Sequence, residues 1–333
     1  MKIKAALALL GLAFLNGCSP LITKTSTPPP TNSIVPSPSP SPTMEMRYEL
    51  ASVIKQTDNS YSVYSSQIGC LDLTPCVESS TKMFQEPFDI YNLSWSPDGH
   101  SLAFSGENQR GAFDIYVSTN DGKTITNITN TIDYKDLYPS WSSDGSKIAY
   151  LSTHAIKLPR LLISSPDGSD ATQILNNVAN PYQVVWSRQG MLAYSAFVSD
   201  QDIRYQIRVL NQDDSLYWLI PFNTDDSVSG NVLGSFSPDG NFLVYMGDIH
   251  KSGKIYLADL RTKTVRNLSP SEVPCDESYP SWSPDGQWIA FLSTCGGQVS
   301  SNYQIVFLNV SQNRRAVINL EIDGVIYYVT WRP

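Results

Sequence analysis

Carboxylates and a tyrosine occur together in two short segments of the chain, each just ahead of a Pro-Ser-Trp tripeptide. Grouped carboxylates attract a basic protein segment or a hard cation such as Ca²⁺, and they repel nucleic acid. A tyrosine beside them adds a flat contact surface. We therefore predict that these residues bind a partner: Asp136, Tyr138, Asp276, Glu277 and Tyr279.

The same acidity extends over six segments that recur along the chain, residues 85–92, 129–138, 176–182, 222–232, 269–279 and 321–325. They contain eleven acidic residues and a single basic one, Lys135. The whole chain has a net charge of −8, so its acidity is concentrated in these segments. The alternative is that they are merely solvated loops, because loops are polar in most proteins.

No catalytic motif accompanies these residues. The sequence contains no Gly-x-Ser-x-Gly elbow, no His-Glu-x-x-His pair and no Gly-x-x-x-x-Gly-Lys-Ser/Thr phosphate loop. The three histidines are His100, His154 and His250. A metal pair from His154 and His250 is an alternative to plain surface residues. We expect a protein that is not an enzyme and has no cofactor, with Ca²⁺ at the acidic segments as the open option.

A five-residue repeat predicts the β-strands that must position these residues. An aromatic residue, a serine and a turn recur with spacings of 46, 45, 50, 46 and 49 residues, a period typical of propeller blades. The copies are Trp95-Ser96-Pro97-Asp98-Gly99, Trp141-Ser142-Ser143-Asp144-Gly145, Trp186-Ser187-Arg188-Gln189-Gly190, Phe236-Ser237-Pro238-Asp239-Gly240, Trp282-Ser283-Pro284-Asp285-Gly286 and the truncated Trp331-Arg332-Pro333.

Each copy is followed by the same pattern of short apolar segments. A strand ends at the aromatic residue, Ser-Pro-Asp-Gly makes a tight turn, and three further strands follow. Four antiparallel strands make one propeller blade. Residues 47–84 supply three strands without an anchor, and residues 326–332 supply an anchor strand with nothing after it. We predict an all-β, six-bladed propeller over residues 45–333, closed by pairing of the C-terminal strand with the N-terminal blade.

These repeats resemble the PD40 repeats of the TolB-like propeller family, over essentially all of residues 45–333. Two copies depart from the pattern, because Arg188-Gln189 replaces Pro-Asp and Phe236 replaces Trp. The resemblance implies a WD40-like propeller fold and a partner among cell-envelope proteins.

The N-terminus has the composition of an export signal. Lys2 and Lys4 precede an apolar run that ends in Leu-Asn-Gly-Cys, which resembles a bacterial lipobox with Cys18 as the lipidated residue. We predict a signal peptide over residues 1–17. The alternative is ordinary secretory cleavage with Cys18 incidental. Residues 18–44 are rich in Pro, Ser and Thr and are predicted to be an extended linker.

The four remaining cysteines are even in number, as expected for an exported protein with disulfides. They are Cys70, Cys76, Cys275 and Cys295. The predicted topology places the first two in one loop and the last two at one end of the last complete blade. It therefore favours the pairs 70–76 and 275–295, with free thiols or a metal site as the alternative.

Rigid propellers display many loops, and function resides in such loops. We predict a monomeric binding or scaffold module that engages an envelope protein or a basic peptide segment. It is expected to be exported and lipid-anchored, at the outer membrane facing the periplasm or on the outer face of a single membrane. The alternative function is binding of a carbohydrate or another small ligand, with or without catalysis, at the central channel.

Overall fold

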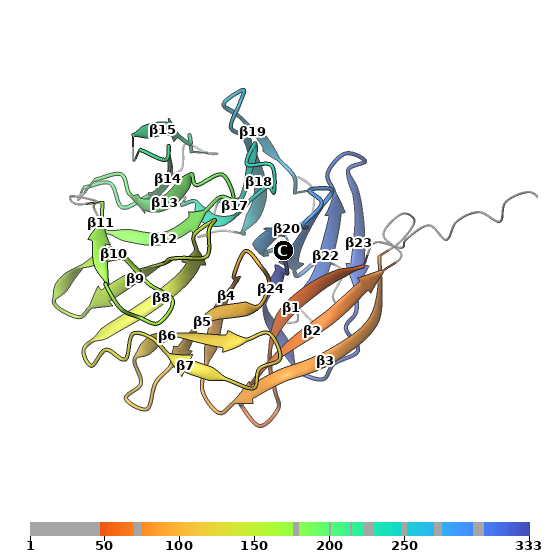
Figure 1. Cartoon of the computed structure of the whole chain (residues 1–333). Coiled ribbons are helices and arrows are strands. Elements are labelled where there is room, and N and C mark those ends of the chain that lie inside the picture. The colour runs from red at the N-terminus through yellow and green to blue at the C-terminus, as the bar shows by residue number, and fades with distance from the viewer. Residues whose placement is uncertain are drawn as a thin grey trace, which may run out of the picture. The chain divides into compact units, whose positions relative to one another are not determined.

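The structure is a computed structural model that describes residues 47–69, 75–175, 180–199, 201–213, 215–222, 230–247, 252–269, 275–295 and 303–333. The chain divides into two units, residues 1–44 and 45–333, and every described residue belongs to the second. Within these residues the chain forms 24 strands, in six four-stranded antiparallel sheets arranged as a propeller (Figure 1). The predicted fold is confirmed.

Each blade begins with the strand nearest the central channel. Blade I contains β4 (Ile90–Trp95), β5 (Ser101–Glu107), β6 (Phe113–Thr119) and β7 (Ile125–Asn127). Blade II contains β8 (Tyr134–Trp141), β9 (Ile148–His154), β10 (Lys157–Ser164) and β11 (Thr172–Ile174). Blade III contains β12 (Pro181–Trp186), β13 (Leu192–Phe197), β14 (Tyr205–Leu210) and β15 (Leu216–Leu219).

The other three blades follow the same order. Blade IV contains β16 (Val232–Phe236), β17 (Phe242–Gly247), β18 (Lys254–Asp259) and β19 (Thr264–Asn267). Blade V contains β20 (Glu277–Trp282), β21 (Trp288–Ser293), β22 (Gln304–Asn309) and β23 (Arg314–Ile318). Blade VI joins the two ends of the propeller: β24 (Val325–Trp331), β1 (Tyr48–Lys55), β2 (Tyr61–Gly69) and β3 (Cys76–Glu86).

The repeated turn is held by its own serine and aspartate. In blade I, the Ser96 hydroxyl donates to Asp98 over 2.6 Å, and Asp98 also accepts the backbone N–H of His100 at 2.9 Å. Gly99 has φ +68°, a left-handed conformation that a glycine adopts without steric cost. These hydrogen bonds lower the pKa of Asp98, the bond from Ser96 having the largest effect. The turn carboxylates are therefore part of the fold.

Apolar side chains fill the junctions between blades. The described residues form six buried clusters, and each joins two neighbouring blades. At the junction of blades V and VI, for example, Leu50 and Trp331 pack with Trp288 and Phe307. Burial of apolar surface between blades is the main favourable contribution to the ring.

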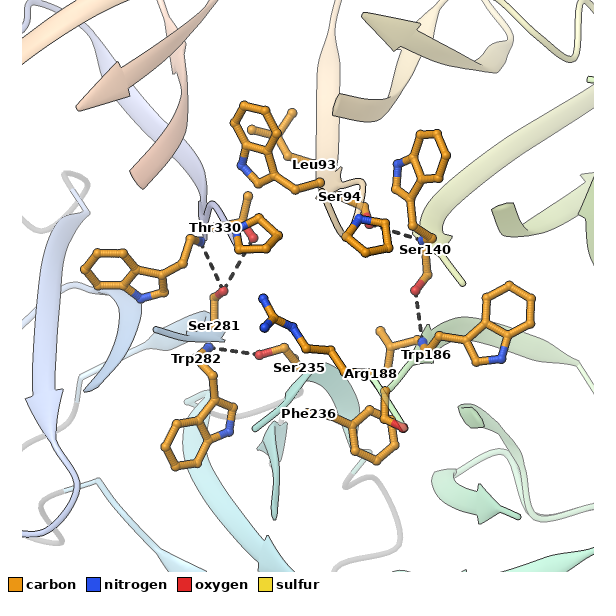
Figure 2. Close-up of a pocket in the computed structure, with 18 of the residues that line it drawn as sticks. Leu93, Ser94, Ser140, Trp186, Arg188, Ser235, Phe236, Ser281, Trp282 and Thr330 are labelled. Carbon is orange, nitrogen blue, oxygen red and sulfur yellow. Dashed lines mark hydrogen bonds between the residues drawn. The ribbon is translucent and has the colours of Figure 1, made fainter. Parts of the chain in front are cut away.

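Hydrogen bonds link the inner strands of neighbouring blades around the channel (Figure 2). The residue just before an anchor aromatic accepts the backbone N–H of the next blade's anchor: Ser140 accepts from Trp186 at 3.0 Å, and Ser235 accepts from Trp282 at 2.9 Å. Equivalent bonds of 3.4 Å join Trp141 to Ser94 and Trp331 to Ser281. Blade III has Val185 at this position, which has no hydroxyl.

The ring is closed by the last strand. β24 pairs antiparallel with β1, from Leu50 opposite Trp331 to Lys55 opposite Val325. Beyond the strand, Arg332 forms an ion pair of 2.5 Å with Glu49. Blade VI therefore depends on both ends of the propeller, as the sequence predicts.

Candidate binding site in the central channel

The six inner strands surround a central cavity of about 200 Å³. The anchor aromatics Trp95, Trp141, Trp186, Phe236, Trp282 and Trp331 surround it, together with the serines that precede or follow them (Figure 2). We call the end that carries the Ser-Pro-Asp-Gly turns the turn end, and the opposite end, where loops lead into the inner strands, the loop end. The cavity is the candidate binding site because hydroxyl groups from all six blades line it, while the rings of Trp186, Phe236 and Trp282 point away from its middle (Figure 2).

Tyrosines gather toward the loop end of the channel. Tyr138 and Tyr328 line the cavity, and the Tyr138 hydroxyl lies 2.6 Å from that of Tyr182. The ring of Tyr279 packs on Tyr328 with centroids 5.0 Å apart, and Tyr182 packs on Tyr205 at 4.8 Å. We call these five residues, contributed by blades II, III, V and VI, the tyrosine cluster.

Two tyrosines of the cluster have strained backbone conformations, which set the direction of their rings. Tyr138 and Tyr279 have φ angles of 57° and 54°, in the left-handed region that bulky residues rarely adopt. Each precedes a proline at a point where the pairing register of its inner strand shifts. A residue held in this region costs about 1–3 kcal/mol, so the fold has to compensate for both, and such strain is found at binding sites.

Burial keeps the hydroxyl groups of Tyr138 and Tyr279 protonated at physiological pH. Burial raises the pKa of Tyr138 far above its ordinary value, and the neighbouring Tyr182 raises it further. Burial also raises the pKa of Tyr279 to about 12, although 36% of this residue is exposed. These two tyrosines therefore offer aromatic faces and uncharged hydroxyl groups to a ligand.

The predicted acidic partners of these tyrosines are turned into the protein. Asp136 is 1% exposed and accepts the Thr131 hydroxyl at 3.0 Å, while its second carboxylate oxygen has no partner among the described residues. Thr131 also donates to the buried Asp114. Burial raises the pKa of Asp136, and the charge of Asp114 adds to the rise.

Glu277 stands at the equivalent position of blade V, and its surroundings differ. It is fully buried, pairs with Arg315 over 2.6 Å and accepts the Ser269 hydroxyl. Its neighbour Asp276 accepts the Tyr303 hydroxyl and the Gly253 N–H, both at 2.8 Å. We expected these carboxylates to present charge to a partner, but those of Asp136 and Glu277 lie inside the fold. Of the five predicted residues, the structure brings Tyr138 and Tyr279 together at the channel.

The sequence reasoning missed four residues at or beside the channel. Tyr182, Tyr205 and Tyr328 complete the tyrosine cluster, and the Arg188 side chain reaches toward the middle of the channel (Figure 2). For Arg188 a signal was present, because it replaces the proline of the repeat. Tyr182 and Tyr328 lie near their anchors, as Tyr138 does, but neither is accompanied by a carboxylate.

Comparisons with known proteins agree with this architecture. No family model matches the chain. Over 142 residues it is 30% identical to the Tol-Pal system protein TolB of two Francisella tularensis strains, FSC 198 and SCHU S4, a match covering 43% of this chain. The chain spans only 28% of the length of these relatives. In fold, it resembles TolB from Acinetobacter baumannii with a TM-score of 0.67 and 17% identity, over 86% of this chain and 67% of that one.

The chain is thus similar to TolB proteins in part of its sequence and in its propeller fold. A putative TolB from Agrobacterium tumefaciens also resembles it, with a TM-score of 0.59 and 15% identity over 86% of this chain and 99% of that one. So does a chain of the nidogen/laminin complex, with a TM-score of 0.61 and 11% identity over the same shares. One propeller fold thus occurs in unrelated settings, and function has to be argued from the site.

The remaining predicted sites of this TolB-like chain are only partly described. Cys275 and Cys295 form a disulfide beside Asp276, with Cα atoms 5.0 Å apart. Cys76 is disulfide-bonded as well, but Cys70 lies outside the described residues, as do Cys18 and the signal and linker segments. The pairing of Cys70 with Cys76 and the lipidation of Cys18 stay predictions.

The described part of the propeller has neither a metal-binding cluster nor a membrane-spanning helix. There, no three His, Cys, Asp or Glu side chains gather closely enough to hold a metal ion. His154 packs against Tyr134, whereas His250, its predicted alternative partner, is outside the described residues. No helix with the length and apolar character of a membrane span occurs among the described residues. Binding of Ca²⁺ stays a prediction.

Proposed function

We propose that this protein is a non-enzymatic binding module of the cell envelope, which holds a segment of a partner protein at the loop end of its channel. The observation that carries the proposal is the convergence of Tyr138, Tyr182 and Tyr279 from three blades, with two of them in strained backbone conformations. Tyrosines bury large areas at low entropic cost, which makes them frequent anchors of protein interfaces.

The charges around the cluster indicate what kind of segment would bind. Asp133, Glu321 and Asp323 are exposed in the loops that lead into inner strands. Lys135 is the single base of those six loops. A basic segment would therefore be attracted toward the loop end, whereas an acidic one would be repelled. The buried Asp136 and Glu277 and the half-buried Asp276 act in this proposal as supports that position the two strained tyrosines.

The TolB-like relatives support an envelope setting. Those matched in sequence are named for the Tol-Pal system, and we extend this setting to the present chain as part of the proposal. Lipidation at Cys18 would tether the propeller to a membrane, with residues 19–44 as the spacer.

Substitution of Tyr279 tests the proposal, because its partial exposure allows the ring to be removed at little cost to the fold. We expect Tyr279→Ala to reduce capture of a protein from detergent-solubilised envelope by about tenfold or more, as is usual for an aromatic anchor. Tyr134→Ala is the matched control: this tyrosine lies at the start of β8, near the loop end, but it packs on His154, whereas Tyr279 packs on Tyr328 of the tyrosine cluster.

A parallel glycan array addresses the carbohydrate alternative. If a glycan binds in a Tyr279-dependent manner and no protein does, the channel is a carbohydrate site and the proposal is wrong. Equal protein capture by the wild type and Tyr279→Ala would also refute it, provided that both melt at the same temperature.

A further inference from the structure

The turn of blade III contains a positively charged residue, Arg188, whose side chain does not stabilise the turn. Arg188 and Gln189 replace Pro and Asp, yet Gly190 still donates to the Ser187 carbonyl at 3.1 Å, and Met191 donates to the Ser187 hydroxyl at 2.9 Å. Gln189 donates to the carbonyl of Pro238 in the next blade. The turn is therefore closed without any contribution from the Arg188 side chain.

Arg188 extends into the channel without a partner. Figure 2 shows its guanidinium directed toward the middle of the ring of anchor aromatics. The residue is exposed, and it makes no hydrogen bond or ion pair with any residue that the structure describes. Arg332, the other arginine at this level, differs because it is paired with Glu49 and stacks over Trp95 at 5.2 Å. Among the described residues that line the cavity, Arg188 is thus the charged side chain that has no counter-charge.

The cavity excludes acids although the protein is rich in them. The chain has 31 acidic and 23 basic residues, but the two arginines are the only charged side chains among the described residues that line the cavity. The nearby turn carboxylates are engaged elsewhere, since each accepts a hydroxyl from the serine of its own turn: Asp98, Asp144, Asp239 and Asp285. The third turn, where Gln189 stands, has no such carboxylate. The side chains that line the cavity therefore carry a net positive charge within an acidic protein.

We propose that the turn end of the channel binds a single carboxylate of a peptide, held by the guanidinium fork of Arg188. A guanidinium matches a carboxylate with two parallel N–H···O bonds. Multiply charged anions such as phosphate fit less well, because one free arginine offers one positive charge. A volume of about 200 Å³ equals roughly seven waters, enough for an acidic side chain or a chain terminus.

This site does not rest on the proposed function at the loop end. Along an inner strand, Tyr138 and Tyr279 lie three residues before the anchor, whereas Arg188 lies two residues after it. The tyrosines therefore stand toward the loop end of the cavity and Arg188 stands at its turn end. Arg188→Gln leaves the tyrosine cluster intact, and Tyr279→Ala leaves Arg188 intact, so either proposal can fail alone.

The test is an NMR titration that follows the arginine side-chain Nε–H signals of the purified full-length protein at constant ionic strength. The probes are acetyl-Gly-Glu-Gly-amide, whose carboxylate is on a side chain, and acetyl-Gly-Gln-Gly, whose carboxylate is terminal. Neutral acetyl-Gly-Gln-Gly-amide and inorganic phosphate are the comparison probes. The signal of Arg188 is assigned by its loss in Arg188→Gln.

We expect at least one carboxylate peptide to shift the Arg188 signal, and we expect the neutral peptide to leave it in place. Arg188→Gln should weaken binding about tenfold or more, and the double variant R188P/Q189D, which restores the turn of the other blades, should do the same. Arg110→Gln removes an exposed arginine from the β5–β6 hairpin and should bind as the wild type does.

The preferred peptide identifies the source of the carboxylate, a side chain or a chain terminus. Four results would overturn the proposal: no shift with either carboxylate peptide, equal binding of the neutral peptide, equal affinity of the wild type and Arg188→Gln, or tighter binding of phosphate than of both carboxylates.

Discussion

Glu277→Gln should destabilise the propeller, whereas Asp136→Asn should not, although both carboxylates lie five residues before an anchor tryptophan. Glu277 has no exposure and forms a 2.6 Å ion pair with Arg315, which in turn donates to the Leu268 carbonyl at 2.7 Å. Neutralising the carboxylate leaves the guanidinium without its counter-charge.

The expected loss for Glu277→Gln is about 1.5–3 kcal/mol, the usual contribution of a hydrogen bond to a charged group. Removing one member of a fully buried pair costs about 3–5 kcal/mol, but the Arg315 side chain is 24% exposed and can regain water. The glutamine oxygen can still accept one bond from Arg315, which also keeps the loss toward the lower range.

Asp136→Asn should leave the free energy of unfolding at pH 7 unchanged or slightly higher. Asp136 is buried beside a second carboxylate, Asp114, and no described residue forms an ion pair with it. An asparagine keeps the oxygen that accepts the Thr131 hydroxyl, and it removes a buried charge.

The two variants also differ in their dependence on pH. Burial raises the pKa of Asp136 in the folded state, so the folded protein holds this proton at a pH where the unfolded chain, with a pKa of about 3.9, has released it. Wild-type stability due to this group therefore falls as pH rises from that value through the folded pKa. Relative to the wild type, Asp136→Asn should gain stability across the same window.

Urea denaturation at several pH values, followed by tryptophan fluorescence and circular dichroism, measures these differences. Two results would contradict this reasoning. One is an unchanged free energy of unfolding for Glu277→Gln, and the other is a loss of stability for Asp136→Asn at pH 7 as large as that for Glu277→Gln.

Three further predictions concern closure, the disulfide and the membrane. Trp331→Ala should lower the free energy of unfolding by about 3–5 kcal/mol, and deletion of residues 326–333 should abolish cooperative melting; a truncated protein that melts like the full chain would disprove the closure. Reduction of the Cys275–Cys295 disulfide, which spans 20 residues, should cost about 3 kcal/mol in urea denaturation, and an unchanged midpoint would contradict this. Cys18→Ala should release the protein from the membrane fraction or block its maturation, and unchanged fractionation would mean that Cys18 is not the anchor.

The blade architecture was predictable because its signals are local. A Ser-Pro-Asp-Gly turn is closed by bonds between residues two to five positions apart, as from Ser96 to Asp98 and from Ser101 to Ser96. Any copy of the motif therefore folds in the same way, and its spacing counts the blades. The closure of blade VI followed from the same count, because an anchor strand at one end matched three unanchored strands at the other.

The acidic residues were harder to judge. Asp136 and Glu277 look alike in sequence, with a tyrosine two residues later and a tryptophan five residues later. Only the fold brings Arg315 to Glu277 from 38 positions along the chain, and Asp114 close to Asp136. Whether a side chain is buried depends on residues that are distant in the sequence. The local sequence therefore suggested that these two carboxylates are exposed, whereas both are buried.

The sequence by itself determined the strands, the turns, the number of blades and the way in which the ends meet, since each depends on contacts within one repeat or on the count of repeats. Tertiary structure decided what the channel contains. Closing six strands into a ring brings Tyr138, Tyr182 and Tyr279 together, although each comes from a different blade, and it directs Arg188 inward. The chemistry of the channel arises from ring closure, which no single repeat encodes.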